Sequence, residues 1–301
     1  MGIDVPALQL LSWASSKSNG LGVAATIGRQ SVNVPANVLR RLVSLPETYQ
    51  YPQYCEDLLI GALGAERVDS FDYSNFEGCT YVADMNQPLP PPCQYDTIID
   101  SGTLEHIYNV PQALRNISLL CAVGGQILHC LPAANFCGHG FWQFSPELFF
   151  SLYSAGNGYS ETQVFIVDLD DETAWYEVLP PSGGYRATVW SDTPLYVLCR
   201  TVRQGDFNHE SVQQSDYVFA WNLRPGDKVP EGVSVTPNKL TAALKRTRFT
   251  RLVSVMKFFY LGMAVGLGLK RGSLAGRNPS LIRRKVSDLN KNQVQQTNAS
   301  S

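Results

Sequence analysis

The sequence lacks several motifs by which enzymes are most readily assigned. It contains no GxGxxG run followed by an acidic residue roughly 20 positions later, which argues against a nicotinamide enzyme. It also contains no P-loop, so nucleotide hydrolysis is disfavoured. Its seven cysteines include no CxxC pair, and an odd, unpaired set is typical of reduced thiols in a cytosolic protein.

The amino-terminal segment MGIDVPALQL has neither a basic n-region nor a long apolar h-region. A secretory signal is therefore not expected, and we predict a cytoplasmic protein. The 301 residues are 44% hydrophobic and 17% charged, which excludes full-length disorder, collagen-like repeats and a coiled coil. A chain of this length can bury a substantial core without disulfides or metals.

The net charge of −2 conceals an uneven distribution. Residues 1–223 hold 9 basic and 23 acidic side chains, whereas residues 224–301 hold 15 basic and 3 acidic ones. The strongly basic carboxyl-terminal part indicates a separate role, such as contact with an anionic surface. Nucleic acid is not an expected partner, because the acidic part of the chain would repel phosphate.

Short apolar segments alternate with helical patterns along most of the chain. Helices are expected near residues 34–45, 53–63, 110–121 and 146–154. Strands are expected at residues 21–28, 67–71, 79–83, 95–99, 125–131, 163–168 and 194–203. This alternation is typical of an α/β domain. We predict a Rossmann-like, seven-stranded, mostly parallel sheet with helices on both faces, followed by a basic and apolar helical extension.

Changes in composition divide the chain into a series of parts. They are an amino-terminal lead-in (1–20), the α/β domain (21–223), a linker (224–244), a basic apolar helical extension (245–286) and a disordered tail (287–301). The extension contains an apolar run, 252–269, that is interrupted by Lys257 and flanked by basic residues. Three roles stay open for this run: an interfacial helix on an anionic membrane, a helix for packing or self-association, and a spanning helix.

Polar residues or glycine follow four of the expected strands. They are Gly28, Asp72, Asp84 and Asp100, in the order of the chain. In open α/β sheets ligands bind beyond the carboxyl ends of the strands, near the point where strand order reverses. The ordered set therefore predicts a ligand site at that edge of the sheet.

Residues 95–129, YDTIIDSGTLEHIYNVPQALRNISLLCAVGGQILH, resemble the fourth-to-fifth strand region of class I S-adenosylmethionine-dependent methyltransferases. FDYSNFEG (71–78) and YVADMNQPLP (81–90) resemble the ends of the second and third strands of that family. The resemblance extends over roughly residues 20–203. GHGFWQFSPELFF (138–150), together with TIGRQS at the first strand, resembles an uncharacterised bacterial subgroup. The resemblance implies methyl transfer from S-adenosylmethionine to a small-molecule or glycan-type acceptor.

The same resemblance implies which residues hold the cofactor. Asp72 would accept hydrogen bonds from the ribose hydroxyls, and Asp84 with the next residue would contact adenine. The cofactor-binding residues expected from the resemblance are Gly28, Arg29, Gln30, Asp72, Tyr73, Asp84, Met85, Asn86, Ser101 and Gly102. The first-strand motif TIGRQS departs from the family's glycine-rich loop. Arg29 either pairs with the carboxylate of the methionine moiety or binds a structural carboxylate, in which case the site has decayed.

A general base is needed when the methyl acceptor must lose a proton. Candidates on the acceptor side are Asp100, Glu105, His106 and His139, of which Asp100, His106 and His139 are the predicted catalytic residues. No metal site is predicted, because the histidines lack tight ligand spacing. The alternative to an enzyme is a non-catalytic Rossmann-like scaffold that binds a partner, as the missing glycine-rich loop suggests.

Overall fold

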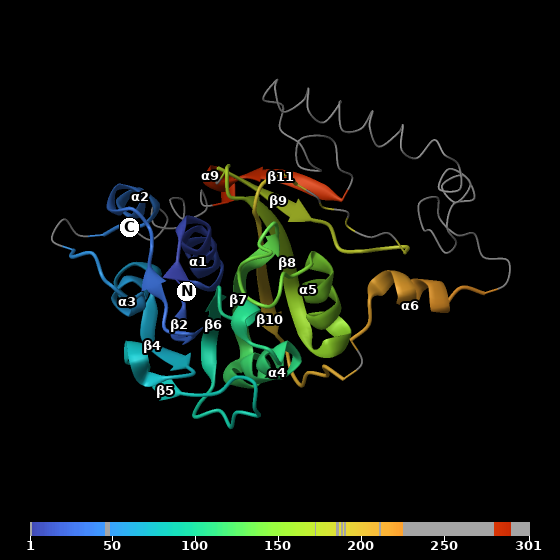
Figure 1. Cartoon of the computed structure of the whole chain (residues 1–301), viewed down its shortest axis with the longest axis horizontal. Coiled ribbons are helices and arrows are strands. Elements are labelled where there is room, and N and C mark those ends of the chain that lie inside the picture. Colours follow the sequence, from blue (N-terminus) through green and yellow to red (C-terminus); the bar gives the residue numbers. More distant parts are fainter. Residues whose placement is uncertain are drawn as a thin grey trace, which may run out of the picture.

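The computed structural model describes residues 2–45, 49–171, 173–184, 187, 189, 191–210, 212–224 and 280–289. In this part of the chain nine strands form one twisted sheet (Figure 1) in the order β11, β9, β8, β10, β7, β6, β2, β4, β5. The strands are β2 (Gly22–Ile27), β4 (Ala65–Asp72), β5 (Tyr81–Val82), β6 (Tyr95–Ser101), β7 (Cys121–Ala134), β8 (Tyr159–Asp168), β9 (Ala174–Val178), β10 (Leu195–Arg203) and β11 (Leu281–Lys285). A separate two-stranded sheet pairs β1 (Gly2–Ile3) with β3 (Ser31–Val32).

One half of the large sheet is parallel. Strands β5, β4, β2, β6 and β7 are joined by parallel ladders. The chain runs outward from β2 through β4 to β5 and then starts again at β6 on the other side of β2. Strand order therefore reverses between β2 and β6, the position beside which open α/β sheets bind ligands. The α/β fold expected from the sequence is confirmed.

The other half of the sheet corrects the prediction of a seven-stranded, mostly parallel sheet. Strand β10 is antiparallel to both β7 and β8, β9 is antiparallel to β8, and β11 is antiparallel to β9. The sheet is therefore mixed and has two more strands than expected within the described residues. Both additional strands, β9 and β11, lie at the same edge (Figure 1).

Strands β9 and β11 were not predicted from the sequence, for two different reasons. The five residues of β9 lie in a segment rich in Asp, Glu, Gly and Pro, which favours a loop. Strand β11, LIRRK, falls in the segment expected to be a helical extension, but it pairs residue by residue with β9. Arg284 and Glu177 form an ion pair of 2.6 Å across this ladder. Charged side chains suit an exposed edge strand because they oppose further strand pairing.

Helices cover both faces of the sheet (Figure 1). The helices of the described residues are α1 (Val5–Ser18), α2 (Ala36–Leu42), α3 (Glu56–Leu63), α4 (Val110–Leu120), α5 (Pro146–Leu152), α6 (Ser215–Trp221) and α9 (Val286–Leu289). Of these, α6 projects away from the sheet and has no buried residue (Figure 1). Two apolar cores result, because successive strand residues point to opposite faces: Ala24 and Ile99 belong to the core under α1, and Ala25 and Ile98 to the core under α4. The helix expected near residues 110–121 is present as α4, and it buries an apolar face that includes Leu114, Ile117 and Leu120.

Helix α1 is part of the core and not a lead-in to it. Asp4 caps the helix by accepting a hydrogen bond of 3.0 Å from the Ala7 N–H, and Asn19 ends it in the left-handed conformation. Trp13 is buried with its ring edge-on to Phe165 and Trp175, at centroid distances of 5.4 Å and 6.0 Å. The residues 1–20 were expected to be a lead-in because their sequence is polar and rich in serine near residues 15–20. Within α1 this polar sequence is confined to the last turn.

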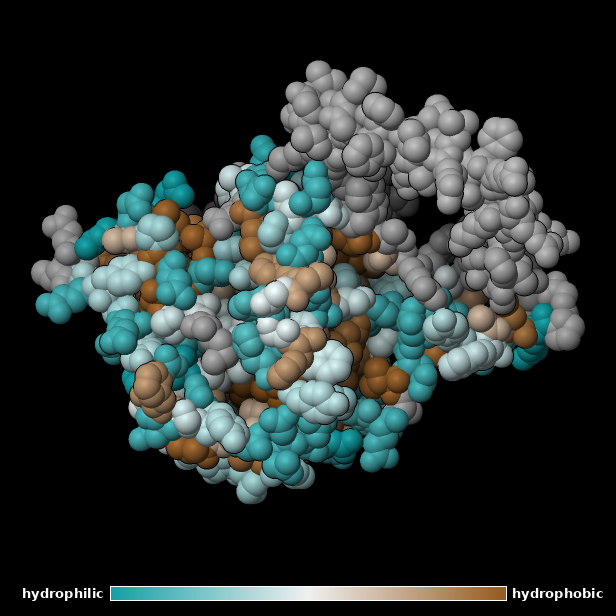
Figure 2. Space-filling model, viewed as in Figure 1, coloured by the Kyte–Doolittle hydropathy of each residue, from teal (hydrophilic) through white to brown (hydrophobic). Residues whose placement is uncertain are grey.

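The apolar run at 252–269, the expected linker at 224–244 except for Arg224, and the tail beyond residue 289 lie outside the described residues. Within the described part of the chain, no helix has the length and apolar character needed to cross a membrane. The face shown in Figure 2 is mainly hydrophilic, and its apolar residues form small separate patches. Most large apolar side chains are instead in the two cores.

If β11 completes the sheet, its removal should destabilise the whole fold. A chain ending at residue 279 loses the ladder with β9 and the burial of Val286, which alone contributes roughly 1.5 to 3 kcal/mol. We expect a lower melting temperature in thermal unfolding. A chain ending at residue 289 keeps both elements and serves as the control. Equal melting temperatures for the two chains would show that β11 is dispensable.

Candidate functional site

The loops that follow β2 and β4 are joined by the backbone of Gly28 and Arg29. Gly28 has φ +73°, a left-handed conformation that glycine adopts without strain. Its N–H donates to the Phe71 carbonyl at 2.7 Å, and the next N–H, of Arg29, donates to Asp72 Oδ2 at 3.1 Å. The predicted residues Gly28 and Asp72 therefore lie together at the carboxyl ends of adjacent strands.

Gln30 closes the space between the ends of β2 and β6. Its side chain is fully buried, and Nε2 donates to the Ile27 carbonyl at 2.8 Å and to Thr103 Oγ1 at 3.2 Å. The Thr103 hydroxyl also donates to the Ile27 carbonyl, at 2.5 Å. The amide nitrogen of Gln30 is thus used to hold two loops together. Its Oε1 is buried, and none of the residues that the structure describes donates a hydrogen bond to it.

The side chain of Arg29 is held by the protein itself. Its Nε donates to Glu56 Oε1 at 2.8 Å, and its guanidinium lies 4.0 Å from the centre of the Tyr54 ring. Nη1 donates to the carbonyl oxygens of Glu77 and Gly78. The sequence left two roles open for Arg29. The ion pair with Glu56 corresponds to the second of them, in which Arg29 binds a structural carboxylate.

Asp72 keeps capacity to bind a ligand. Its Oδ2 accepts the Arg29 N–H, and its Oδ1 accepts a long hydrogen bond of 3.4 Å from the Ser74 N–H. A carboxylate offers about four lone-pair sites, so Asp72 can accept further hydrogen bonds. The neighbouring Tyr73 is 74% exposed and stands beside this carboxylate in the chain.

Asp84 lies beside Asp72, since the Ala83 N–H donates to the Asp72 carbonyl at 2.7 Å. Asp84 Oδ1 accepts two hydrogen bonds from Asn86, one from its N–H at 2.9 Å and one from Nδ2 at 2.8 Å. This is a local Asx turn, and the described residues place no donor on Asp84 Oδ2. Asn86 is further tied to the start of α4, because its Oδ1 accepts the Asn109 N–H at 2.9 Å. Met85 between them is buried.

Asp100 occupies an interior position and is 1% exposed to solvent. Its Oδ1 accepts the N–H groups of Thr103 and Leu104 at 3.2 Å and 3.3 Å. Its Oδ2 lies 2.8 Å from Nδ1 of His129, whose Nε2 lies 2.7 Å from the Tyr153 hydroxyl. Since the carboxylate accepts, His129 donates through Nδ1 and accepts from Tyr153 through Nε2. Asp100 is therefore a positioning residue, in place of the general base expected from the sequence.

A cavity of about 190 Å³ lies beyond the carboxyl ends of β6 and β7. It brings together the predicted residues Ser101, Gly102, His106 and His139. It also contains Glu105 and, from the amino-terminal segment and β10, Asp4 and Tyr196. Asp4 and Tyr196 could not be predicted as members of this site, because their approach depends on how α1 and β10 pack.

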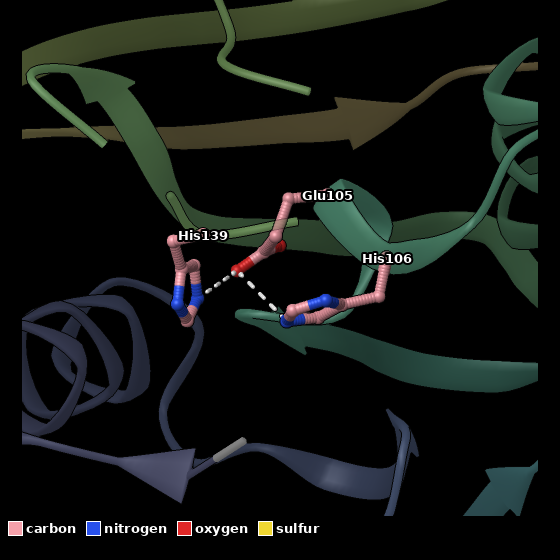
Figure 3. A group of neighbouring side chains, drawn as sticks. All are labelled: Glu105, His106 and His139. Atoms are coloured by element: carbon pink, nitrogen blue, oxygen red, sulfur yellow. Dashed lines mark ion pairs between the residues drawn. The ribbon is translucent and has the colours of Figure 1, made fainter. Parts of the chain in front are cut away.

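Glu105 is the central group of this cavity. Its side chain is 1% exposed, and its Oε1 lies 3.4 Å from His139 Nε2 and 3.9 Å from His106 Nε2 (Figure 3). Burial, with the negative charge of Asp100 nearby, raises the pKa of Glu105 to about 8. Burial and the neighbouring His139 lower the pKa of His106. The donor atoms of all three side chains lie within 4.8 Å of one another, a separation that a metal ion could bridge.

The chain is similar in fold to solved structures of methyltransferases. NodS, an N-methyltransferase from Bradyrhizobium japonicum WM9 in complex with S-adenosyl-L-homocysteine, is 12% identical with a TM-score of 0.40, over 67% of this chain and 89% of that chain. The 1,6-didemethyltoxoflavin-N1-methyltransferase from Burkholderia thailandensis, with bound 1,6-didemethyltoxoflavin and S-adenosylhomocysteine, is 15% identical with a TM-score of 0.36, over 67% and 80%. StiE O-MT is 13% identical with a TM-score of 0.37, and the match covers 71% of this chain and 80% of that chain. These values assign neither a ligand nor an activity to this chain. No protein-family model matches it, and no curated protein is similar to it in sequence.

The buried position of Asp100 predicts a large loss of stability in Asp100→Ala. The substitution leaves two N–H groups and the ring of His129 without their acceptor, which should lower the free energy of unfolding by roughly 3 to 5 kcal/mol in urea denaturation. Asp100→Asn retains an acceptor for the N–H groups of Thr103 and Leu104 and should lose less. An Asp100→Ala chain as stable as the wild type would contradict the positioning role.

Proposed function

We propose that this chain binds S-adenosylmethionine at the carboxyl ends of β2, β4 and β5 and transfers its methyl group to an acceptor in the cavity beside Glu105. The observation that carries the proposal is the pair Asp72 and Asp84. They end adjacent strands on one side of the point where strand order reverses, and both retain free acceptor positions.

The residues at these strand ends suit the adenosine half of the cofactor. Asp72 is half-buried and can accept both hydroxyls of a ribose diol, since its carboxylate has lone pairs left. Asp84 Oδ2 faces no donor among the described residues and can accept from the adenine amino group. The methionine half finds no such match, because Arg29 and Gln30 are already bound within the protein. Gly28 and Gly102, both with positive φ, leave the backbone open there.

When bound, the cofactor supplies a methyl group already activated on a sulfonium. The chain has to align the acceptor with that group, exclude water and accept a proton where the acceptor carries one. His106 and His139 stand at the mouth of the cavity, with 41% and 53% of their side chains exposed. Their imidazoles are the groups placed to take this proton, while Asp100 holds the turn that carries His106.

The acceptor is proposed to be a small molecule or a glycan-type compound. A cavity of about 190 Å³ holds only the reacting end of such a molecule. Beside it, Tyr108 lies with its ring centre 6.2 Å from that of Phe141 and 6.4 Å from that of Trp142. All three rings are exposed, and aromatic faces with polar edges suit a sugar or a planar group.

A second function, a non-catalytic scaffold that binds a partner, is favoured by a different observation. Gln30 fills the space between the ends of β2 and β6, and Arg29 crosses from β2 to the loop after β4. These two side chains occupy the region where a glycine-rich loop would leave room for a ligand. Binding of the cofactor separates the two functions.

Isothermal titration with S-adenosylmethionine and with S-adenosylhomocysteine tests the proposed function. We expect binding of both, and a loss of about 10- to 100-fold in affinity for Asp72→Ala, because hydrogen bonds to a charged group are removed. Asp96→Ala is the matched control: Asp96 is exposed and accepts the Val23 N–H at the opposite end of the strands. The absence of heat with either ligand, in a folded wild-type chain, would leave the scaffold function.

Arg29→Ala separates a structural role from a cofactor contact. Loss of the contacts with Glu56 and Gly78 should lower the free energy of unfolding by about 1 to 2 kcal/mol, with little change in the affinity for S-adenosylhomocysteine. Glu56→Gln removes the charge partner and should show part of the same loss. A large drop in affinity at unchanged stability would instead assign Arg29 to the methionine carboxylate.

A further inference from the structure

We propose that Glu105, His106 and His139 form a binding site for one divalent transition-metal ion, with zinc as the reference ion. The three side chains come from two segments: Glu105 and His106 from the 3₁₀ turn η2 (Leu104–His106), and His139 from the loop that follows β7. Figure 3 shows both imidazoles turned toward the same carboxylate oxygen, one from each side. The site shares His106 and His139 with the cavity proposed for the methyl acceptor, but metal binding there does not depend on cofactor binding.

The distances are those of ligands around one ion. Ligands placed tetrahedrally at about 2.0–2.2 Å from zinc lie roughly 3.4 Å from one another. Glu105 Oε1 lies 3.4 Å from His139 Nε2 and 3.9 Å from His106 Nε2. The two imidazole rings have centres 5.0 Å apart and planes inclined at 68°. All three ligand atoms lie within 4.8 Å of one another, so an ion between them requires the two exposed imidazoles to close inward.

The carboxylate of Glu105 has an unmet need for a partner. Its side chain is 1% exposed, and within the described part of the chain no hydrogen-bond donor reaches the buried Oε2. No hydrogen bond joins Glu105 to either histidine side chain, although both converge on it. A buried carboxylate with an unpaired oxygen is costly, and a cation satisfies it more fully than a distant imidazole does.

The backbone around Glu105 is shaped to bring these groups together. Gly140 has φ +72°, and a Cβ there would lie 2.6 Å from the Glu105 carbonyl oxygen. That carbonyl accepts the N–H groups of Phe141 and Trp142, at 2.6 Å and 3.3 Å. These contacts fix the loop of His139 directly against the turn of Glu105. The close approach of the two segments is therefore specified by the sequence and is not a chance meeting of surface side chains.

The donor set indicates the class of metal. Two imidazoles and one carboxylate suit zinc and the neighbouring first-row ions, whereas magnesium and calcium prefer oxygen ligands. Three protein ligands leave at least one coordination position for water or a substrate atom. The cavity beside the three residues gives that position room, and the exposed edges of His106 and His139 give an ion a path to the site.

The test is a zinc titration of the untagged, full-length chain in a Cys137→Ser background, because Cys137 is exposed and lies close to His139 in the chain. We expect one zinc ion per chain, and a cobalt spectrum with d–d bands but no thiolate-to-cobalt band. Glu105→Gln and His139→Ala should each weaken zinc binding about tenfold or more, and zinc should no longer raise the melting temperature of the double variant. Magnesium should not compete.

Cys79→Ser is the matched control, since it removes a partly exposed thiol away from the cluster and should leave zinc binding unchanged. Glu105→Gln has nearly the shape of the native side chain and replaces the buried carboxylate with an uncharged amide. The variant should therefore fold. Unchanged zinc affinity in folded Glu105→Gln and His139→Ala chains would overturn the site. So would zinc binding that disappears with Cys137→Ser, or equal competition by magnesium. The readout is metal binding, so a failure here leaves the proposed cofactor binding untouched.

Discussion

The arrangement of the site depends on one buried carboxylate, that of Asp100. It lies within β6 and binds the N–H groups of Thr103 and Leu104, so it sets the point where the strand ends and the next turn begins. Through His129 it also holds β7 and Tyr153 near the end of α5. Glu105 and His106 follow this turn directly. The orientation of their side chains therefore depends on the buried carboxylate of Asp100. The charge of Asp100 also contributes to the raised pKa of Glu105.

The parallel half of the sheet could be predicted from the sequence because its signals are local. Short apolar runs closed by Gly28, Asp72 or Asp84 mark each strand and its end without knowledge of the partner. The antiparallel edge could not be predicted in this way. The five residues of β9 are surrounded by turn-forming residues, and β11 carries three basic residues whose burial pattern depends on pairing with β9. The same holds for helix α1. Its polar last turn indicates an amino-terminal lead-in, whereas its burial depends on packing against the sheet.

The candidate site shows the same division. The strand-end rule correctly placed Gly28, Asp72, Asp84 and Asp100 at or next to the carboxyl ends of their strands, since it depends only on strand direction. The sequence left two roles open for Arg29 and could not decide between them. Its contacts with Glu56 and Tyr54 depend on the packing of α3 and of the loop before it. Nor could the meeting of Glu105 with His139, because it depends on a tight loop closed at Gly140.

The pairing of β11 with β9 has a consequence for the order in which the protein folds. The hydrogen bond from Arg284 to Glu177 joins residues that are 107 positions apart in the chain. During synthesis the edge of β9 therefore stays unpaired long after the parallel half of the sheet has been made. Closing so long a loop costs entropy that local helices do not incur, so the antiparallel edge is expected to form last. Until then, an open strand edge is available to other chains, which makes nascent protein at this stage the form most exposed to aggregation.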